Sequence, residues 1–393
     1  MSVATASPAS GRKTLAVCGS VHALHDGFTD LLNALYPLLQ AQFGLSYAAV
    51  GALKTVYSGA MAAGQIPSGM LAERFGAVRV LALGTALVGV GYALAGISGS
   101  LIGVVAGLLL AGLGGSTQHP IASSLVAAAF TGRRSRTALG TYNFSGDLGK
   151  VALPVLFALV AAALGWRDAL IIIAIMAAVG AGVIFATLPV RAAAAKSESA
   201  VVAGRDRPQA YWLLFAIHIA DDLVRTGFLI FLPFLLRDKG ADLPTIGLGL
   251  SLLFAGGAAG KLAMGWVGAR LGVVPSVILT EVATTLLILA LLPLSLPLAL
   301  VLLPAVGLML NGTSSVLYGT VPEFVSEKKR TRAFAIFYTG GSVAGAVGPF
   351  LFGLVGDQIG LPAALSVVAC VALITVPLVW LLKPALSTSG PSA

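Results

Sequence analysis

Charged side chains are scarce in this chain of 393 residues, in which Asp, Glu, Lys and Arg together make up only 10%. Soluble domains carry about 25% charged residues, so the composition excludes an ordinary soluble protein. Hydrophobic residues make up 58% of the chain, and the mean hydropathy is +0.96. Apolar runs of about 18 residues or more recur along the whole length, and each could cross ~30 Å of hydrocarbon as a helix. We therefore expect an all-α polytopic membrane protein.

Cysteine is almost absent as well. The two cysteines, Cys18 and Cys370, both fall in hydrophobic segments, which excludes a disulfide framework and a cysteine-based metal site. Alternating segments of about ten residues are also missing, which argues against a transmembrane β-barrel. The formal net charge of +9 is best explained by basic cytoplasmic loops. We expect no nucleic-acid partner, no metal centre and no cofactor.

Twelve hydrophobic segments are predicted to span the membrane as helices. Their approximate bounds are 15–40, 46–71, 78–97, 101–130, 137–163, 168–189, 210–236, 244–268, 273–294, 298–325, 332–356 and 361–382. The tail before the first segment is short and polar, and no small-residue cleavage site stands at the right place. We therefore interpret the first segment as a retained helix and not as a signal peptide.

Basic residues are distributed unequally over the loops between these segments. Only three of the 24, Arg167, Arg237 and Lys239, lie in the loops of one side. Seventeen lie in the tails and the alternate loops: Arg12, Lys13, Arg74, Arg79, Arg133, Arg134, Arg136, Arg191, Lys196, Arg205, Arg207, Arg270, Lys328, Lys329, Arg330, Arg332 and Lys383. Since loops rich in Lys and Arg stay in the cytoplasm, both termini are predicted to be cytoplasmic.

The chain also repeats itself at an offset of 196 residues. The identical pairs are His22/His218, Asp26/Asp222, Pro37/Pro233, Gly51/Gly247, Arg74/Arg270 and Gly76/Gly272. The stretch VRAAAAKSESAVVAGRDRPQ at 190–209 separates the two copies and is typical of a flexible linker. We therefore predict two parallel six-helix bundles, 1–189 and 210–393, joined by a cytoplasmic linker. Transporters commonly bind their substrate between such repeats.

The stretch GMLAERFGAVR at 69–79 resembles the loop motif of the major facilitator superfamily, roughly G-x-L-a-D-R-x-G-R-R. Glu73 replaces the usual Asp of this motif, and Ala77 replaces a usual basic residue. A second copy, GWVGARLG at 265–272, has Ala269 where the acid would be. The resemblance implies the major facilitator fold. It also implies an intracellular conformational latch formed by Gly69, Glu73, Arg74, Gly76, Arg79 and Arg270.

Three further stretches resemble the fosmidomycin-resistance group of bacterial efflux proteins. They are LLNALYPLLQAQFGLSYAAVG at 31–51, STQHPIASSLV at 116–126 and NFSGDLGKVALP at 143–154. This likeness implies a monomeric, proton-coupled antiporter of the bacterial inner membrane that exports a small polar or anionic compound or drug by alternating access. Two features depart from drug antiporters. The glycine-proline motif lies in the eleventh segment, and the usual arginine of the fourth segment is absent.

Ionisable residues interrupt the first hydrophobic segment. His22, Asp26 and Asp30 follow one another at i, i+4 and i+8, so they form one polar stripe along a helix. A central charge costs ~2.5–3.5 kcal/mol in lipid, so the stripe must face water or partners of opposite sign. We predict that it lines the transport route. Asp26 is the first candidate for the proton carrier and Asp222 the second, with Asp30 and His22 assisting.

Polar residues on other segments are predicted to complete the route. The family resemblance places helices 1, 4, 7 and 10 around the central cavity and helix 5 beside it. The candidate substrate-binding residues are His25, Gln118, His119, Asn143, Asp147, Lys150, His218, Asp221 and Arg225. Lys150 and Arg225 would attract an anionic group, although their pairs with neighbouring aspartates can equally be structural. Glu281, alone in the ninth segment, fits a lipid-edge or structural role.

Three other functions fit parts of the sequence. The same residues suit proton-coupled import of an organic anion. The two His-x-x-x-Asp pairs would also suit export of a divalent metal, but Lys150 and Arg225 argue against it because they repel cations. No convincing serine motif supports an intramembrane protease, so we predict a transporter and not an enzyme.

The distribution of basic residues predicts which loops face the cytoplasm. In a variant without Cys18 and Cys370, Ala200→Cys should react with a membrane-impermeant thiol reagent only from the cytoplasm. Gly240→Cys should react only from the outside. Labelling of both positions from the same side would rule out the twelve-span topology.

Overall fold

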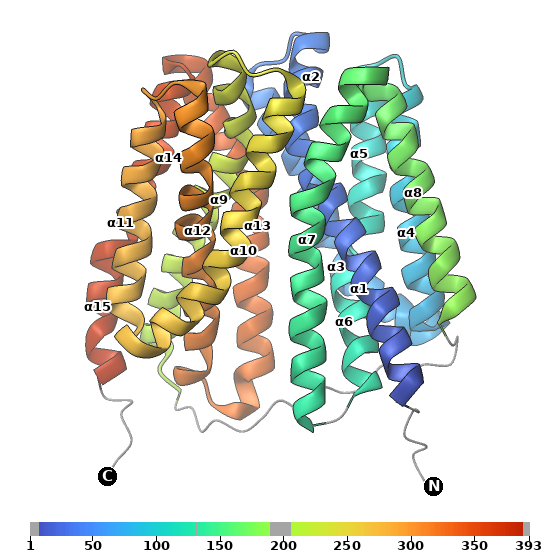
Figure 1. Ribbon diagram of the computed structural model, residues 1–393. Helices are drawn as coiled ribbons and strands as arrows, with labels where there is room; N and C mark the ends of the chain where they lie inside the picture. Colours follow the sequence, from blue (N-terminus) through green and yellow to red (C-terminus); the bar gives the residue numbers. More distant parts are fainter. Residues whose placement is uncertain (1–7, 131, 189–205, 388–393) are drawn as a thin grey trace, which may run out of the picture. The chain divides into compact units, whose positions relative to one another are not determined.

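The computed structural model describes residues 8–130, 132–188 and 206–387, and every regular element in these ranges is helical (Figure 1). The first half contains α1 (Pro8–Asp30), α2 (Leu32–Phe43), α3 (Tyr47–Phe75), α4 (Ala77–Ile97), α5 (Leu101–Gly115), α6 (Gln118–Ala129), α7 (Gly132–Leu164) and α8 (Trp166–Thr187). The second half contains α9 (Pro208–Asp238), α10 (Leu243–Leu271), α11 (Val273–Leu291), α12 (Leu296–Thr320), the 3₁₀ turn η1 (Val321–Glu323), α13 (Glu327–Ile359), α14 (Leu361–Ala372) and α15 (Thr375–Ser387). These helices form the twelve predicted spans, so the predicted all-α fold class is confirmed.

Three spans that were predicted as continuous helices are each interrupted once. The fourth span breaks between α5 and α6, because Pro120 has no N–H to donate to the carbonyl of Ser116. The twelfth span breaks between α14 and α15, where Pro377 stands in the same relation to Leu373. The first span breaks at Leu31, between α1 and α2.

Three helices begin at least five residues earlier than predicted, α1 at Pro8, α7 at Gly132 and α13 at Glu327. Some basic residues that were assigned to loops therefore lie in the first helical turns. Lys and Arg have unbranched side chains that lose little freedom in a helix, so they extend it readily. The predicted linker at 190–209 lies outside the described residues up to residue 205.

Asp206 ties the start of α9 to the start of α13. Its carboxylate accepts hydrogen bonds from Nζ of Lys329 at 2.7 Å and from the N–H of Ser326 at 2.8 Å. The hydrogen bond from Lys329, followed by that from Ser326, lowers the pKa of Asp206 from 3.8 to about 2. Because the folded pKa is the lower one, this contact favours folding above pH 3.8 and is lost as the pH falls towards about 2.

The described residues form two compact units. Unit 1 comprises residues 8–38 and 56–188, and unit 2 comprises residues 39–55 and 206–387. The end of α2 and the first turns of α3 therefore belong to unit 2. The predicted bundle boundaries, which follow the two halves of the chain, stay a prediction.

Unit 1 is built around α1 and α4. Helix α1 packs against α6, α7 and α8, and α4 packs against α5 and α8. One part of its core is formed by Cys18, Val21, Leu81, Ile121, Leu125, Tyr142 and Ile184. Figure 1 shows that α1 begins and α8 ends at the same end of this unit. An even number of spans in unit 1 follows from that arrangement.

Unit 2 is built in the same way around α9, which packs against α13, α14 and α15. Helix α12 packs against α10 and α11, and α11 also contacts α14 and α15. Asp357 of α13 caps the start of α3, since its two carboxylate oxygens accept the N–H groups of Tyr47 and Ala48 at 2.7 and 3.0 Å. These N–H groups have no partner inside their own helix, so the cap holds the first turn of α3 on unit 2.

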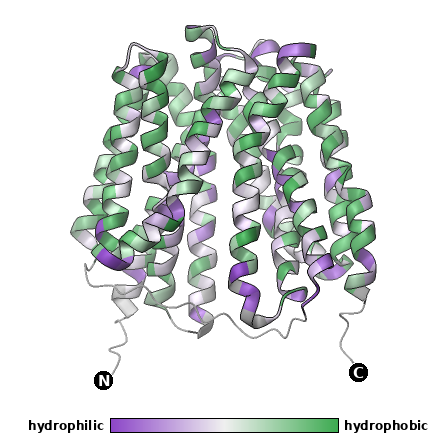
Figure 2. Cartoon of the chain, turned by 180° about the vertical axis from the view of Figure 1, so that it is seen from behind, coloured by the Kyte–Doolittle hydropathy of each residue, from purple (hydrophilic) through white to green (hydrophobic). Residues whose placement is uncertain are grey.

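Both units carry an apolar surface. Figure 2 shows helices that are hydrophobic over most of their length, with hydrophilic residues gathered at their ends. Exposed large side chains include Ile66, Leu83, Ile97, Ile102, Ile175, Phe185, Leu262, Leu286, Val301 and Leu381. In the described part, nine helical segments are each long and apolar enough to cross a membrane. The spans outside that set include α1 and α9, the two that carry the ionisable stripes. These are the features of a multi-pass membrane protein.

The two copies of the loop motif share one backbone feature. Gly76, between α3 and α4, has a φ angle of 95°, and Gly272, between α10 and α11, has a φ angle of 82°. A side chain rarely tolerates this left-handed region, because its Cβ clashes with the backbone. The glycine of the motif therefore makes the tight turn between consecutive helices in each unit.

Helices α1 and α7 approach each other closely where Gly149 faces Ala23. A Cβ atom at Gly149 would lie 1.8 Å from the backbone oxygen of Ala23. No side chain other than hydrogen fits in that space. Gly149 therefore sets the distance between the two helices that carry much of the site described below.

We predict that Gly149→Ala destabilises unit 1 by about 1–3 kcal/mol, because overpacking forces α1 and α7 apart. Gly182→Ala in α8 is the matched control, since a Cβ there meets nothing within 4 Å. Thermal unfolding of the purified protein in detergent should show a lower midpoint for the first variant. The control should be unchanged or slightly more stable. Equal midpoints would mean that α1 and α7 can move apart to admit the methyl group without loss of stability.

Candidate functional site

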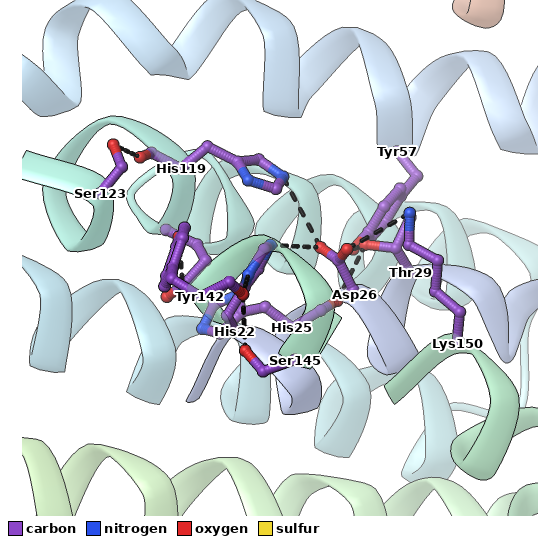
Figure 3. A network of polar contacts seen from close by, with 11 residues as sticks. His22, His25, Asp26, Thr29, Tyr57, His119, Ser123, Tyr142, Ser145 and Lys150 are labelled. Atoms are coloured by element: carbon purple, nitrogen blue, oxygen red, sulfur yellow. Dashed lines mark hydrogen bonds and ion pairs between the residues drawn. The ribbon is translucent and has the colours of Figure 1, made fainter. Parts of the chain in front are cut away.

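Side chains from three helices of unit 1 converge on the carboxylate of Asp26, as Figure 3 shows. His22, one turn earlier on α1, places its Nε2 3.3 Å from Oδ1 of Asp26. His119 of α6 places its Nε2 3.7 Å from the same oxygen. Lys150 of α7 places its Nζ 3.3 Å from Oδ2. The side chain of Asp26 is only 12% exposed, so its charge depends on these three partners.

The ring of His22 is held by Tyr142 of α7. The two rings stack with their centroids 4.2 Å apart, and Nδ1 of His22 lies 2.8 Å from the backbone carbonyl of Tyr142. A carbonyl can only accept, so Nδ1 carries a hydrogen and Nε2 of the neutral ring carries none. A favourable contact between Nε2 and Asp26 therefore requires one additional proton, on the imidazole or on the carboxyl group.

The break in the fourth span positions two more of the predicted residues. Helix α6 begins at Gln118, so His119 lies in its first turn. The Gln118 amide donates to the hydroxyl of Tyr142 at 3.4 Å. Gln118 thus supports the residue that holds His22, whereas His119 reaches the carboxylate itself.

Four predicted site residues of unit 1 lie outside this cluster. His25 turns towards α4, where its Nε2 lies 2.9 Å from Oγ1 of Thr85. Asp30 is buried at the end of α1 and accepts a hydrogen bond from the amide of Asn33 at 3.4 Å. The other two are on α7, the exposed Asn143 and the half-buried Asp147. The predicted polar stripe of α1 is therefore divided among different neighbours.

Unit 2 contains the equivalent His–Asp pair with a different cation. His218 places Nε2 3.3 Å from Oδ2 of Asp222, and its ring stacks on Phe337 of α13 at a centroid distance of 4.0 Å. The same Nε2 lies 3.2 Å from the carbonyl of Phe337, so it carries a hydrogen even in the neutral ring. Arg225, one turn along α9, forms an ion pair with Oδ1 of Asp222.

Glu281 is not at the lipid edge, so that one of its two expected positions is wrong, whereas a structural role stays a prediction. Its side chain is 2% exposed and lies within reach of Asp221 of α9 and Thr313 of α12. Helix α11 turns its polar side inwards because a carboxyl group facing lipid would lack any partner. Asp221 therefore contacts a second carboxyl group, which the sequence did not indicate.

The repeat extends to residues that the sequence did not single out. Tyr142 and Phe337 stack on the equivalent histidines, and glycines let the neighbouring α7 and α13 approach the aspartates. A Cβ at Gly146 would lie 2.6 Å from the carboxylate of the first unit, and one at Gly341 would lie 2.1 Å from that of the second. The sequence did contain a sign of this repeat, because the aromatic residues Tyr142 and Phe337 stand 195 residues apart, and so do Gly146 and Gly341.

The offset of 196 relates one more pair of contacts. His25 and Asp221 stand at equivalent positions 196 residues apart, and so do Thr85 and Glu281. The first unit therefore has a neutral His–Thr hydrogen bond where the second unit has two carboxyl groups. The backbone geometry is shared, and the chemistry is not.

Each cluster offers three ligand atoms within 4.8 Å of one another, a spacing that suits a metal ion. The two sets are His22, Asp26, His119 and His218, Asp221, Asp222. In each set a basic side chain already binds the aspartate, Lys150 in one and Arg225 in the other. A divalent cation would have to displace that ammonium or guanidinium group, so the arrangement suits an anion or a proton better.

The residues of the predicted latch lie on the surface. Glu73, Arg74 and Arg79 are exposed. The guanidinium of Arg270 lies over the ring of Trp266, 3.7 Å from its centroid. Gly69 has open space around it. The role of this set as a latch stays a prediction.

The sequence of this chain is similar to those of known membrane transporters. A family model described as Major Facilitator Superfamily matches residues 18–219 and 214–393. The "Fosmidomycin resistance protein" of Escherichia coli (strain K12) is 29% identical over 165 residues, which cover 41% of this chain and 40% of that protein. The "Probable 4-methylmuconolactone transporter" of Cupriavidus pinatubonensis (strain JMP 134 / LMG 1197) is 26% identical over 375 residues, 92% of this chain and 87% of that protein.

A solved structure shares the fold over the whole chain. It is a bacterial homolog of the human lysosomal transporter Spinster in an inward-facing and occupied conformation. It matches with a TM-score of 0.85 and 16% sequence identity, and covers 99% of this chain and 100% of that one. With twelve spans, a repeated half and the family match over both halves, the chain belongs to the major facilitator superfamily and is a multi-pass membrane transporter of a small molecule.

Proposed function

We propose that this protein is a proton-coupled transporter of a small organic anion in the bacterial inner membrane, working by alternating access. Asp26 is the proton site and Lys150 is the anion site in this proposal. The observation that carries it is the meeting of Asp26 with His22, His119 and Lys150. We further propose that both termini are cytoplasmic, that the protein is a monomer, and that the loop-motif residues form the latch.

The geometry of His22 and Asp26 supports a proton site at this pair. Since Nδ1 of His22 donates to a backbone carbonyl, the contact of its Nε2 with Asp26 is attractive only when one of the two groups is protonated. Histidine and carboxylate exchange protons readily when they are neighbours in a partly desolvated site. The pair is therefore suited to take up and release a single proton.

The anion site follows from exposure and charge. The side chain of Lys150 is 26% exposed and that of His119 is 49% exposed, whereas Asp26 lies beneath them at 12%. A substrate that approaches the cluster meets the basic groups first. An ammonium group at the edge of an apolar bundle binds carboxylate or phosphate by charge-assisted hydrogen bonds.

This arrangement links anion binding to proton uptake. When an anion draws Lys150 away, Asp26 loses its cation, and its protonated form becomes more favourable. Proton and anion are then carried together, and an inward proton gradient drives import. This is the organic-anion importer that the sequence also allowed.

Export by antiport, which the sequence resemblance implies, requires that substrate and proton compete for the same site. The substrate must then displace the proton, as a neutral or cationic compound would if it bound Asp26 directly. The relative named as a fosmidomycin resistance protein supports this alternative. The direction in which protons move with the substrate therefore distinguishes the two.

We predict that Asp26→Asn retains exchange of substrate across the membrane but abolishes accumulation driven by a pH gradient, because the proton site is gone. Proteoliposomes of known orientation would be tested with fosmidomycin and a panel of short organic acids, with internal pH recorded by a dye. Asp168→Asn, an exposed residue of α8, is the matched control. Full gradient-driven transport in Asp26→Asn would show that the cluster is structural.

In the same assay, wild-type protein is expected to move protons in the direction of the substrate. Protons that move against the substrate would establish the antiporter instead. Asp222→Asn is expected to lower transport less than Asp26→Asn, because Nε2 of His218 carries a hydrogen even in the neutral ring, so its contact with Asp222 needs no additional proton.

We predict that Lys150→Gln weakens binding of an anionic probe about 10-fold or more, since a hydrogen bond to a charged group contributes ~1.5–3 kcal/mol. Binding of a neutral probe should change little. Lys383→Gln, at an exposed lysine near the end of α15, is the matched control. Zn²⁺ transport by the wild type that is unaffected by anions would favour the metal exporter.

A further inference from the structure

Two acidic side chains meet in the core of unit 2. Asp221 of α9 and Glu281 of α11 are each 2% exposed, and their carboxyl groups lie within hydrogen-bonding reach of each other. An ionised carboxylate has no hydrogen to donate, so a hydrogen bond between two carboxyl groups requires a proton on one of them. The remaining oxygens, Oδ2 of Asp221 and Oε1 of Glu281, are buried and have no hydrogen-bond partner.

The neighbouring hydroxyl groups do not supply the missing hydrogen. Thr313 of α12 contacts Glu281, but its hydroxyl donates to Oγ1 of Thr280 at 2.8 Å. The hydroxyl of Thr280 donates in turn to the carbonyl of Ser276 at 3.0 Å. Both hydroxyl hydrogens are therefore used elsewhere, so neither is left to compensate an ionised Glu281.

The surrounding charges do not neutralise the pair either. The ionisable groups that face it in the described part of unit 2 are His218, Asp222 and Arg225 on α9 and Tyr318 on α12. Helix α14, packed on α9 and α11, carries no Asp, Glu, Lys, Arg or His. Arg225 is already bound to Asp222. Three ionised carboxylates around a single guanidinium would leave two buried negative charges unpaired, which is strongly unfavourable.

The first unit shows that the fold does not need acids at these positions. There His25 and Thr85 occupy the equivalent sites and form a neutral hydrogen bond of 2.9 Å. A neutral pair therefore satisfies the packing of the two helices. The carboxyl pair of the second unit supplies something that packing alone does not require.

We propose that Asp221 and Glu281 form one proton-binding site, a carboxyl–carboxylate pair that holds a single shared proton and is separate from Asp26. The proton forms a hydrogen bond from one carboxyl group to the other, and the pair carries one negative charge in place of two. That the proton is exchanged during transport rests on the proposed function. The presence of the bound proton does not.

Infrared spectroscopy of the purified full-length protein in lipid nanodiscs tests the site directly. At neutral pH the wild type should show the carbonyl band of a protonated carboxyl group, shifted by exchange into D₂O. Glu281→Gln and Asp221→Asn should each remove one component of that band. Glu73→Gln, at an exposed glutamate, should leave the band intact. A wild-type spectrum without the band, or a band unchanged in both amide variants, would overturn the proposal.

A double variant shows whether the loss of the band is due to the missing acids or to loss of folding. Asp221→His combined with Glu281→Thr copies the pair of the first unit, so it should fold, elute as a single species and lack the band component. A band that persists in this variant would also overturn the proposal. The proposal would also be overturned if the wild type lacked the band and its unfolding temperature rose with Na⁺, because a sodium ion would then occupy the pair.

Transport assays separate this inference from the proposed function. If the pair exchanges its proton, Glu281→Gln should flatten the pH profile of transport, while Asp168→Asn, at an exposed acid of α8, keeps the wild-type profile. If Asp26→Asn retains full gradient-driven transport but the infrared component is lost in Glu281→Gln, the proposed role of Asp26 fails and the carboxyl pair stands. If Asp26→Asn loses gradient-driven transport but the infrared component persists in Glu281→Gln, the carboxyl pair is contradicted and the proposed role of Asp26 stands.

Discussion

Burial of ionised groups away from water is the constraint on which the rest of this bundle depends. A carboxylate in a low-dielectric interior is tolerated only with partners that compensate its charge and fill its hydrogen-bonding capacity. Asp26 and Asp222 meet this requirement with a histidine one turn away and one basic side chain each. The aromatic rings that orient the histidines and the glycines that admit α7 and α13 serve the same requirement. Close helix packing and charge compensation are therefore parts of a single arrangement.

The two units use one scaffold for different proton chemistry. In the first, His22 uses Nδ1 for the backbone and presents a bare Nε2 to Asp26. In the second, His218 uses Nε2 for both the backbone and Asp222. The first pair is attractive only with an extra proton, whereas in the second Nε2 carries a hydrogen even in the neutral imidazole. Proton binding in unit 2 is instead assigned to Asp221 and Glu281, where the first unit has a neutral pair.

Much of the fold was predictable, because lipid admits only long apolar helices and the repeat marks equivalent positions. The offset identified the pair His22 and His218 without any coordinates. Hydropathy could not locate the break before Gln118, since that depends on a missing N–H and not on apolarity. Contacts between helices were also beyond the sequence. That Glu281 meets Asp221, and that His25 turns to α4, depends on how α11 and α4 pack against their neighbours.

The placement of the two basic groups has a mechanical consequence. Arg225 and Asp222 share one rigid helix, so no displacement of helices changes their separation. Lys150 and Asp26 stand on different helices, α7 and α1, whose backbones nearly touch at Gly149. A small slide or rotation of α7 therefore lengthens or shortens the 3.3 Å contact and alters the electrostatic potential at Asp26. Unit 1 is in this sense electromechanical, since helix displacement is converted into a change of local charge, and the cation–anion pair on α9 lacks that property.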